Sequence, residues 1–386
     1  MRKKFRSVLY VNYSPYENSG KLLDYLLERF EIVYLFSIGF HPLGSKQKTN
    51  KIVIYKKGIV SREINMHYLA VNNKLVVLLI PVRSTLNLIQ MLWHVTQIVK
   101  SDGKIDVMFS VNAFTAWGGI FFKRLGLVKK TIFWVWDYYP MNHPDFIVQI
   151  MRWMYWQFDK AATFSDRVVY LNNRLADVRV KAGLIKKGTY PLVAIGSEIF
   201  VTKPKKLKKR SLKIGFIGVL KKSQGLDLLI DVSKLLKKEL PNVSFEVIGS
   251  GPDADYFKKK AKKVQAPIKF HGYVDDETFP KILAKCAIGI APYLPDDSNL
   301  SFYGDPGKVK RYLSHGLPVV ITDVFEFSKE LEHSKAGIII DYYDHSTLIA
   351  AISKIAKNYS AYSKNAIKLN KKYYYKDIYS TFFKRI

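Results

Sequence analysis

A basic segment bounded by glycines, residues 304–320, has the residue types that bind an anion. The pattern predicts a turn from Gly304 to Pro306, a short helix that opens at Gly307 and Lys308, a second turn at Gly316 and then a buried strand. We expect the backbone N–H groups of Gly307 and Lys308 to be free at the helix N-terminus, where the helix dipole and the lysine charge favour a diphosphate. An ordinary strand–helix unit with a proline stop gives the same pattern, so both interpretations stay open.

A second glycine-rich turn follows an apolar run at residues 213–217. Gly218 allows close backbone approach and Gly225 opens an amphipathic helix, so the loop between them can face a phosphate. Lys221 and Lys222 lie in this loop and can reach the same anion. They could equally be solvated loop lysines, and a Gly-x-x-Gly pattern alone is weak evidence.

The charge balance points to anionic partners. The 386 residues include 62 Lys and Arg against 32 Asp and Glu, a formal net charge of +30. Such a charge raises the local concentration of polyanions, which could be an acidic membrane surface, nucleic acid or a phosphorylated substrate. Lysine enrichment can also result from the base composition of the genome. Residues 203–213 hold seven basic residues and no acid, and we interpret them as a solvated linker.

The composition also excludes several classes of protein. An apolar content of 48% supports packed cores in two to three domains. The longest apolar run, residues 75–82, is too short to span a bilayer, and the N-terminus resembles a signal peptide only in its charge. A single cysteine, Cys286, rules out an intrachain disulfide framework and a cysteine-rich metal site. We therefore expect a globular cytoplasmic protein.

Short β-rich runs alternate with helix-length segments in both halves of the chain, which predicts an α/β fold. In the first half the runs are residues 8–11, 32–36, 52–55, 76–80, 107–110, 131–135 and 168–171. In the second half they are residues 213–217, 244–248, 268–270, 288–291, 318–321 and 336–340. We predict two Rossmann-like domains, residues 1–202 and 203–372, followed by a helix at residues 373–386.

Three further marks lie between the two glycine segments. Residues 247–252 end in Gly249-Ser250-Gly251-Pro252, residues 270–274 include Tyr273, and residues 289–293 end in Pro292-Tyr293. In this order across residues 213–322, the marks resemble the donor domain of GT-B glycosyltransferases of the retaining, family-4-like group, also called group 1. The resemblance implies two Rossmann-like domains that face a central cleft, and a C-terminal helix that crosses back to the N-terminal domain.

The same resemblance implies that the second domain binds a nucleotide-sugar. The donor-binding residues would be Gly218, Lys221, Lys222, Gln224, Tyr273, Asp305, Gly307, Lys308 and Arg311. Two diphosphate cations of the family motif are replaced here by Val219 and Gln224. Arg311 stands where the family has a ribose-binding Glu, and an arginine cannot accept hydrogen bonds from hydroxyls. Either Asp305 and Lys308 take over these contacts or the donor is held differently.

On the acceptor side, the loop with Ser19 and Gly20 resembles the family's glycine loop near the transferred sugar. Trp136 stands at the position of the family's catalytic histidine, and the following Asp137 is our candidate catalytic residue. Tyr138 beside it could stack on a sugar or a lipid. Asp137 could instead cap the turn before Pro140.

Residues 146–164 mix aromatic and basic side chains densely. We interpret them first as a core helix. The alternative is an amphipathic face that docks on anionic lipid, because the resembled enzymes often act on lipid-linked acceptors.

We therefore predict a glycosyltransferase that moves a sugar from a nucleotide-sugar to a glycan or lipid-linked acceptor in cell-surface polysaccharide or glycolipid synthesis. The resemblance implies a retaining reaction without metal or cofactor. It also implies that the cytoplasmic protein can associate peripherally with the inner face of the membrane. A nucleic-acid binder is one rival, but none of the known recognition modules occurs in the sequence, so we expect no nucleic-acid partner. The other rival is a catalytically silent member that serves as a partner subunit.

Overall fold

The computed structural model describes residues 5–14, 16–39, 50–69, 78–207, 211–275, 277–296 and 300–383. The chain divides into two compact units, Met1–Ala194 and Ile195–Ile386. The predicted boundary between residues 202 and 203 lies within the second of these units. That boundary, and the predicted return of residues 373–386 to the first domain, stay predictions.

The first unit is built on a sheet with the strand order β4-β3-β2-β1-β5-β6-β7. Its strands pair in parallel except for β3, which runs antiparallel to both β2 and β4. The strands are β1 (Ser7–Ser14), β2 (Ile32–Gly39), β3 (Asn50–Lys56), β4 (Ile59–Met66), β5 (Ile105–Ser110), β6 (Val128–Val135) and β7 (Arg167–Tyr170). The helices are η1 (Ser19–Lys21), α1 (Leu22–Arg29), α2 (Ile80–Asp102), α3 (Ala113–Arg124), α4 (Phe146–Ala162) and α5 (Asn173–Lys181).

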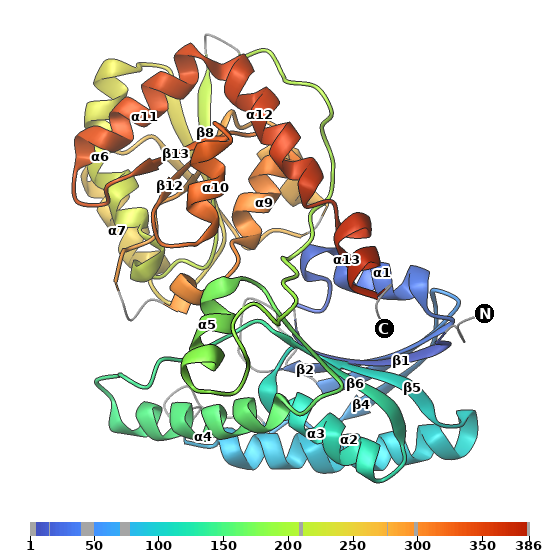
Figure 1. Ribbon diagram of the computed structural model, residues 1–386. Coiled ribbons are helices and arrows are strands. Elements are labelled where there is room, and N and C mark those ends of the chain that lie inside the picture. Colours follow the sequence, from blue (N-terminus) through green and yellow to red (C-terminus); the bar gives the residue numbers. More distant parts are fainter. Residues whose placement is uncertain are drawn as a thin grey trace. The chain divides into compact units, whose positions relative to one another are not determined.

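Helices cover both faces of this sheet. Figure 1 shows α2, α3 and α4 along one face and α1 on the opposite one. Met91 of α2 and Phe122 of α3 pack in one core with Leu9 and Val11 of β1, because alternate residues of a strand point to the same face. β1 and β6 run in the same direction, so the loops that follow them, which hold Ser19 and Asp137, leave the same edge of the sheet.

One strand expectation in the first unit is wrong. Residues 76–80 were expected to be a strand, but α2 begins at Ile80 and carries Pro81 in its first turn; residues 76 and 77 lie outside the described residues. Proline fits the first turn of a helix, where its missing N–H would be unpaired anyway. The other six strand runs of this half are confirmed.

The second unit has a parallel sheet with the order β10-β9-β8-β11-β12-β13. Its strands are β8 (Leu212–Ile217), β9 (Val243–Ile248), β10 (Ile268–Gly272), β11 (Ile288–Ala291), β12 (Val319–Thr322) and β13 (Gly337–Ile340). Its helices are η2 (Lys222–Gln224), α6 (Leu226–Glu239), α7 (Ala254–Lys263), α8 (Thr278–Leu283), η3 (Leu300–Tyr303), α9 (Gly307–Ser314), α10 (Phe327–His333), α11 (His345–Lys357), α12 (Tyr359–Lys372) and α13 (Tyr375–Phe383).

Two separate cores lie on the two faces of this sheet. Helices α6, α7 and α11 share one core with Ile290 and Val320, whereas α8, α9, α10 and α12 share the other with Ala291 and Ile321. This doubly wound arrangement confirms the strand runs expected in the second half. Parallel strands release their loops at one edge, and the loops after β8, β9 and β11 are the ones that the glycine pattern singled out.

None of the helices in the described part of the chain combines the length and the apolar character needed to cross a membrane.

Candidate functional site

Glycines let three loops of the second unit approach one another at the carboxyl edge of its sheet. A Cβ on Gly249, which has φ +140°, would lie 1.9 Å from the Gly218 carbonyl oxygen. A Cβ on Gly225, which has φ +74°, would lie 1.5 Å from the Pro292 carbonyl oxygen. Only glycine fits these positions, so the loop between Gly218 and Gly225 is fixed against its neighbours by backbone packing.

Helix α9 brings Lys308 against this loop. Its Nζ donates a 2.7 Å hydrogen bond to Gln224 Oε1 and lies 4.1 Å from the ring centroid of Tyr293 and 5.0 Å from that of Phe216. A Cβ on Gly218 would meet the same Nζ at 3.0 Å. The structure therefore brings together three of the predicted donor-binding residues, Gly218, Gln224 and Lys308.

The electrostatics of Lys308 suit an anionic ligand. Burial, and to a lesser degree the charge of Lys221, lower the pKa of the Lys308 ammonium to about 7. Within the described part of the chain, no carboxylate forms an ion pair with Lys308, and its hydrogen-bond partner Gln224 is neutral. A half-buried cation without a counter-charge gains most from a ligand that supplies one.

The helix start differs in one respect from expectation. The Gly307 N–H is not free, because it donates a 2.8 Å hydrogen bond to the Asp305 carbonyl oxygen across Pro306. For the Lys308 N–H no such bond is found among the residues that the structure describes. The backbone contribution to an anion site at α9 is therefore reduced to the second residue of the helix.

Three other predicted donor-binding residues are not shown in contact with this group. The Lys222 ammonium sits 5.0 Å from the Tyr256 ring centroid, and the exposed Arg311 guanidinium lies 5.0 Å from that of Phe279. Tyr273 follows β10 and is 61% exposed. Their predicted contacts with a donor stay predictions.

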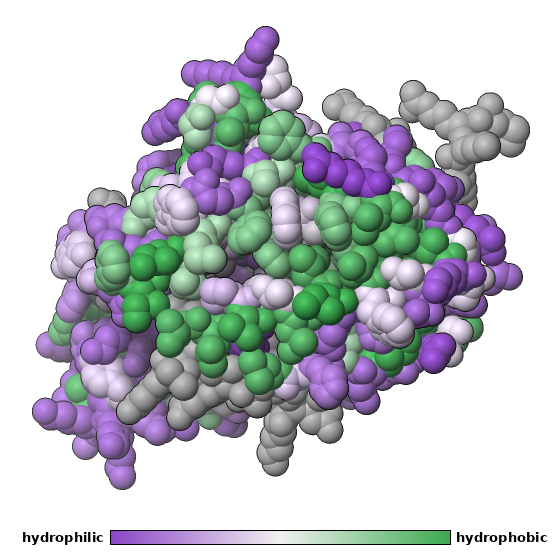
Figure 2. All heavy atoms as spheres, turned by 90° about the horizontal axis from the view of Figure 1, so that it is seen from below, coloured by the Kyte–Doolittle hydropathy of each residue, from purple (hydrophilic) through white to green (hydrophobic). Residues whose placement is uncertain are grey.

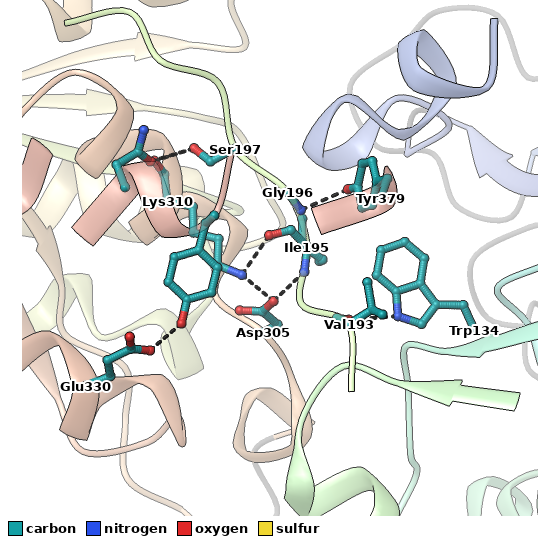
Figure 3. A network of polar contacts seen from close by, with 11 residues as sticks. Trp134, Val193, Ile195, Gly196, Ser197, Asp305, Lys310, Glu330 and Tyr379 are labelled. Carbon is teal, nitrogen blue, oxygen red and sulfur yellow. Dashed lines mark hydrogen bonds and ion pairs between the residues drawn. The ribbon is translucent and has the colours of Figure 1, made fainter. Parts of the chain in front are cut away.

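Asp305 takes part in a buried network within the second unit (Figure 3). Its carboxylate accepts a 2.7 Å hydrogen bond from the Ile195 N–H and forms an ion pair with Lys310, whose Nζ also donates to the Ile195 carbonyl oxygen at 2.8 Å. Lys310 lies 4.5 Å from the Tyr373 ring centroid, and the Tyr373 hydroxyl donates to Glu330. These contacts hold the residues at the unit boundary against α9, so Asp305 already has a structural task.

On the acceptor side, Asp137 follows β6 and is surrounded by tyrosines. Asp137 is an exposed residue, yet the protein around its carboxylate raises its pKa to about 6 by desolvation. Burial and the Asp137 charge together raise the pKa of Tyr13 and Tyr16, which belong to β1 and the loop after it. An aspartate with a raised pKa is suited to accept a proton near neutral pH.

The predicted loop near the transferred sugar adopts a left-handed backbone. In η1, Gly20 has φ +62°, the following Lys21 has φ +64°, and the Ser19 N–H donates to the Tyr16 carbonyl oxygen at 3.1 Å. Tyr16 therefore holds the Ser19 N–H in place and also lies within range of the Asp137 charge.

Trp136 and Tyr138, the neighbours of Asp137 in the chain, are packed against other aromatic rings. Trp136 lies edge-on to Trp134, with ring centroids 5.3 Å apart, and Tyr138 lies edge-on to Trp156 at 5.6 Å. Tyr138 is therefore partly engaged inside the unit, and its proposed stacking on a ligand stays a prediction.

Sequence reasoning missed the aromatic residues that shape both places. Tyr293 and Phe216 surround Lys308, and Tyr13 and Tyr16 surround Asp137. Tyr293 ends one of the family-like marks, which was the available signal for it. Among the described residues, no cluster of three or more His, Cys, Asp or Glu is arranged to hold a metal ion.

Comparisons with known proteins agree with this architecture. Residues 211–358 match the family model described as Glycosyl transferases group 1. A search by sequence among curated proteins finds no match. Among solved structures, sucrose-phosphate synthase from Thermosynechococcus elongatus matches with a TM-score of 0.72 and 12% identity, covering 99% of this chain and 100% of that one.

Two more solved structures are similar over nearly their whole length. HepE of Anabaena in complex with UDP matches with a TM-score of 0.65 and 13% identity, covering 98% of this chain and 99% of that one. WaaG, a glycosyltransferase involved in lipopolysaccharide biosynthesis, matches with a TM-score of 0.63 and 13% identity, covering 97% and 96%. The chain has the GT-B fold, and its resemblance to group 1 glycosyltransferases is confirmed.

Proposed function

We propose that this chain transfers a sugar from a nucleotide-sugar to a glycan or a lipid-linked acceptor. The observation that carries the proposal is the Lys308 ammonium, which is held beside Gly218 and Gln224 without a carboxylate partner in the described residues. The group 1 match includes all three residues, and HepE, which has the same fold, was solved in complex with UDP. A nucleoside diphosphate supplies the missing negative charge.

The proposed chemistry divides between the two units. Negative charge grows on the departing nucleotide as the bond to the sugar breaks, and a protonated Lys308, supported by Lys221, would stabilise it there. Asp137 would accept the proton of the attacking acceptor hydroxyl. A retaining outcome, a reaction without metal, and a place in cell-surface polysaccharide or glycolipid synthesis belong to the proposal because the resembled family implies them.

A catalytically silent partner subunit is the alternative. Val219, Gln224 and Arg311 favour it, since these positions lack the family's usual donor contacts. The position of Lys308 speaks against it, because its ammonium reaches Gln224 and places a cation beside the residue that replaces the family's lysine.

We further propose that the enzyme works in the cytoplasm on an anionic membrane surface. Large apolar side chains are exposed on the face formed by α2, α3 and α4, and Figure 2, seen from the side of these helices, shows apolar atoms gathered there. The exposed residues are Val82, Ile89, Trp93, Phe121, Phe146, Ile147, Ile150 and Trp153. The three helices contain six basic residues, of which Arg83 is buried, and two acidic ones, of which Asp159 is buried, so the face suits acidic lipid.

The donor assignment is tested by a thermal-shift screen of the whole chain against UDP, GDP, ADP and CMP and their sugars, followed by release of the nucleotide in the presence of acceptors. We expect one nucleotide to raise the melting temperature, because a ligand that binds only the folded state stabilises it. If a nucleotide-sugar binds but is never turned over with any acceptor, the silent-subunit alternative replaces the transferase.

A further inference from the structure

An ion pair is buried between α4 and α5 of the first unit. Arg179 and Asp159 have side chains that are 0% and 1% exposed, and they pair through the guanidinium Nη2 and the carboxylate Oδ2. Arg179 Nη1 also donates to the Leu175 carbonyl oxygen at 2.8 Å. Apolar residues of the same volume are often at least as stable as a buried pair, so stability alone is a weak reason for these charges.

The rest of the guanidinium is enclosed by aromatic rings. The Arg179 Cζ lies 5.4 Å from the ring centroid of Trp156, 5.7 Å from that of Tyr138 and 5.8 Å from that of Tyr170. The three rings come from three elements: α4, the loop after β6, and β7. A planar cation can contact all three faces at once, whereas an ammonium is a compact point charge.

Helix α4 also holds the remainder of the loop after β6. Arg152 Nη1 donates to the carbonyl oxygens of Pro140 at 2.8 Å and Asn142 at 3.2 Å. Tyr155 lies edge-on to Tyr139, with ring centroids 4.9 Å apart, and its hydroxyl accepts a hydrogen bond from the Ala113 N–H at 3.3 Å. Four of the five residues that follow Asp137 therefore have a contact with α4.

We propose that the Arg179–Asp159 pair is a positioning device for Asp137, which acts by fixing the ring of the neighbouring Tyr138. The proposal rests on the function proposed above for Asp137. Trp136 on the other side is fixed against Trp134, so Asp137 is the exposed residue between two anchored neighbours. A displacement of about 1 Å is enough to reduce a rate by roughly 10²-fold, so loss of the Arg179 contact is expected to reach the reacting atoms.

The test removes both charges together. The double variant Arg179→Met with Asp159→Leu leaves neither an unpaired buried charge nor an unpaired buried amide, so we expect a melting temperature close to that of the wild type. Turnover, measured as UDP release from UDP-glucose in the presence of a glycan acceptor, should fall about 10- to 100-fold while the dissociation constant of UDP stays unchanged. Amide hydrogen exchange in residues 137–142 should become at least tenfold faster, because the loop has lost its anchor at Tyr138.

Wild-type turnover and wild-type exchange in a stable double variant would overturn the proposal. If the double variant does not fold, Arg179→Lys is the second test, because it keeps the ion pair but not the three ring contacts. It should show the same loss of turnover and the same faster exchange. Unchanged exchange in Arg179→Lys would also overturn the proposal. The function proposed for Asp137 is tested separately, by the turnover of Asp137→Asn. If that variant turns over like the wild type, or if UDP-glucose is not a donor, the amide exchange of residues 137–142 still decides whether the Arg179–Asp159 pair holds the loop.

Discussion

Lys308 owes its chemical character to its surroundings rather than to its place in a motif. Two aromatic rings and a neutral amide replace the water around its ammonium, and Lys221 adds a like charge. Burial and, to a lesser degree, the Lys221 charge lower its pKa to about 7, so the free protein holds a cation that is close to releasing its proton. A bound anion would raise the pKa of Lys308 again, because it favours the charged form of the ammonium group.

Removal of this ammonium should weaken binding of a nucleoside diphosphate. We expect Lys308→Ala to cost about 1–3 kcal/mol of binding free energy, which is typical of a lost charge-assisted contact. The matched control is Lys237→Ala on α6 of the same unit, because Lys237 is exposed and belongs to none of the predicted donor contacts. Calorimetry on both variants checks the prediction, and equal losses in the two would contradict a specific role for Lys308.

The same site should bind a diphosphate with a characteristic pH dependence. Well below pH 7 Lys308 is already protonated, so its own contribution to the affinity should no longer change with pH. Above pH 7 the ammonium must first take up a proton, so the dissociation constant should rise by up to about tenfold per pH unit until the pKa of the bound state is reached. Calorimetry in buffers of different ionisation enthalpy should show proton uptake at pH 8, and Lys308→Ala should abolish it.

Asp137 should contribute to turnover and not to donor binding. If it accepts the proton of the acceptor hydroxyl, Asp137→Asn should reduce turnover by about 10²–10⁴-fold, with nucleotide affinity unchanged. The wild-type rate should fall as pH drops below about 6, because the base is then protonated. Asparagine caps turns nearly as well as aspartate, so near-wild-type turnover and melting temperature would identify Asp137 as a cap.

At the scale of single residues, the sequence predicted which residues could bind an anion better than it predicted which residues lie next to them in space. The glycine pattern indicated Gly218, Gln224 and Lys308, which the structure brings together. It could not show that Asp305 accepts a hydrogen bond from the Ile195 N–H, because Ile195 lies 110 residues earlier in the chain. Tyr13 and Tyr16 were missed for the same reason, since only the parallel pairing of β1, β5 and β6 makes their loops neighbours of Asp137.

At the scale of elements, buried strands were predicted and the exposed one was not. Strands β8, β9 and β11 are short, mostly apolar runs bounded by turn residues, a pattern typical of buried strands. β4 pairs antiparallel at the sheet edge and is mostly exposed, so its polar residues gave no strand signal. The start of α2 was mistaken for a strand because a short apolar run fits either structure.

The loop before α6 depends on one glycine. Gly225→Ala combines an unfavourable positive φ, worth about 1–2 kcal/mol, with a Cβ 1.5 Å from the Pro292 carbonyl oxygen, for which overpacking adds about 1–3 kcal/mol. Gly272→Ala is the control, since Gly272 has φ +70° with nothing within 4 Å of the added Cβ. Urea unfolding should show a clearly larger loss of stability for Gly225→Ala, and equal losses would mean that the close approach is relieved at no cost.

At the scale of the whole molecule, charge and exposed apolar surface act on the same partner. The formal charge of +30 attracts any anionic surface, but attraction alone does not orient the protein. The exposed side chains of α2, α3 and α4 supply a face that can enter the lipid interface, and Trp93 and Trp153 are of the type that prefers it. The net charge should therefore determine how strongly the protein binds to an anionic membrane. The apolar face should determine which side of the protein contacts the lipid.

Two variants separate these contributions. Trp153→Glu places a charge in the apolar face at a residue that is 58% exposed, and we expect it to weaken binding to vesicles of mixed neutral and acidic lipid about tenfold or more. Leu235→Glu on α6 of the second unit is the control, because it changes the net charge equally at a residue that is 53% exposed. Wild-type binding should also fall steeply as salt rises past physiological strength, where charges are screened beyond about 8 Å. Co-sedimentation at several salt concentrations measures both effects, and equal weakening by the two variants, or equal binding to neutral vesicles, would remove the α2–α4 face as the membrane-docking surface.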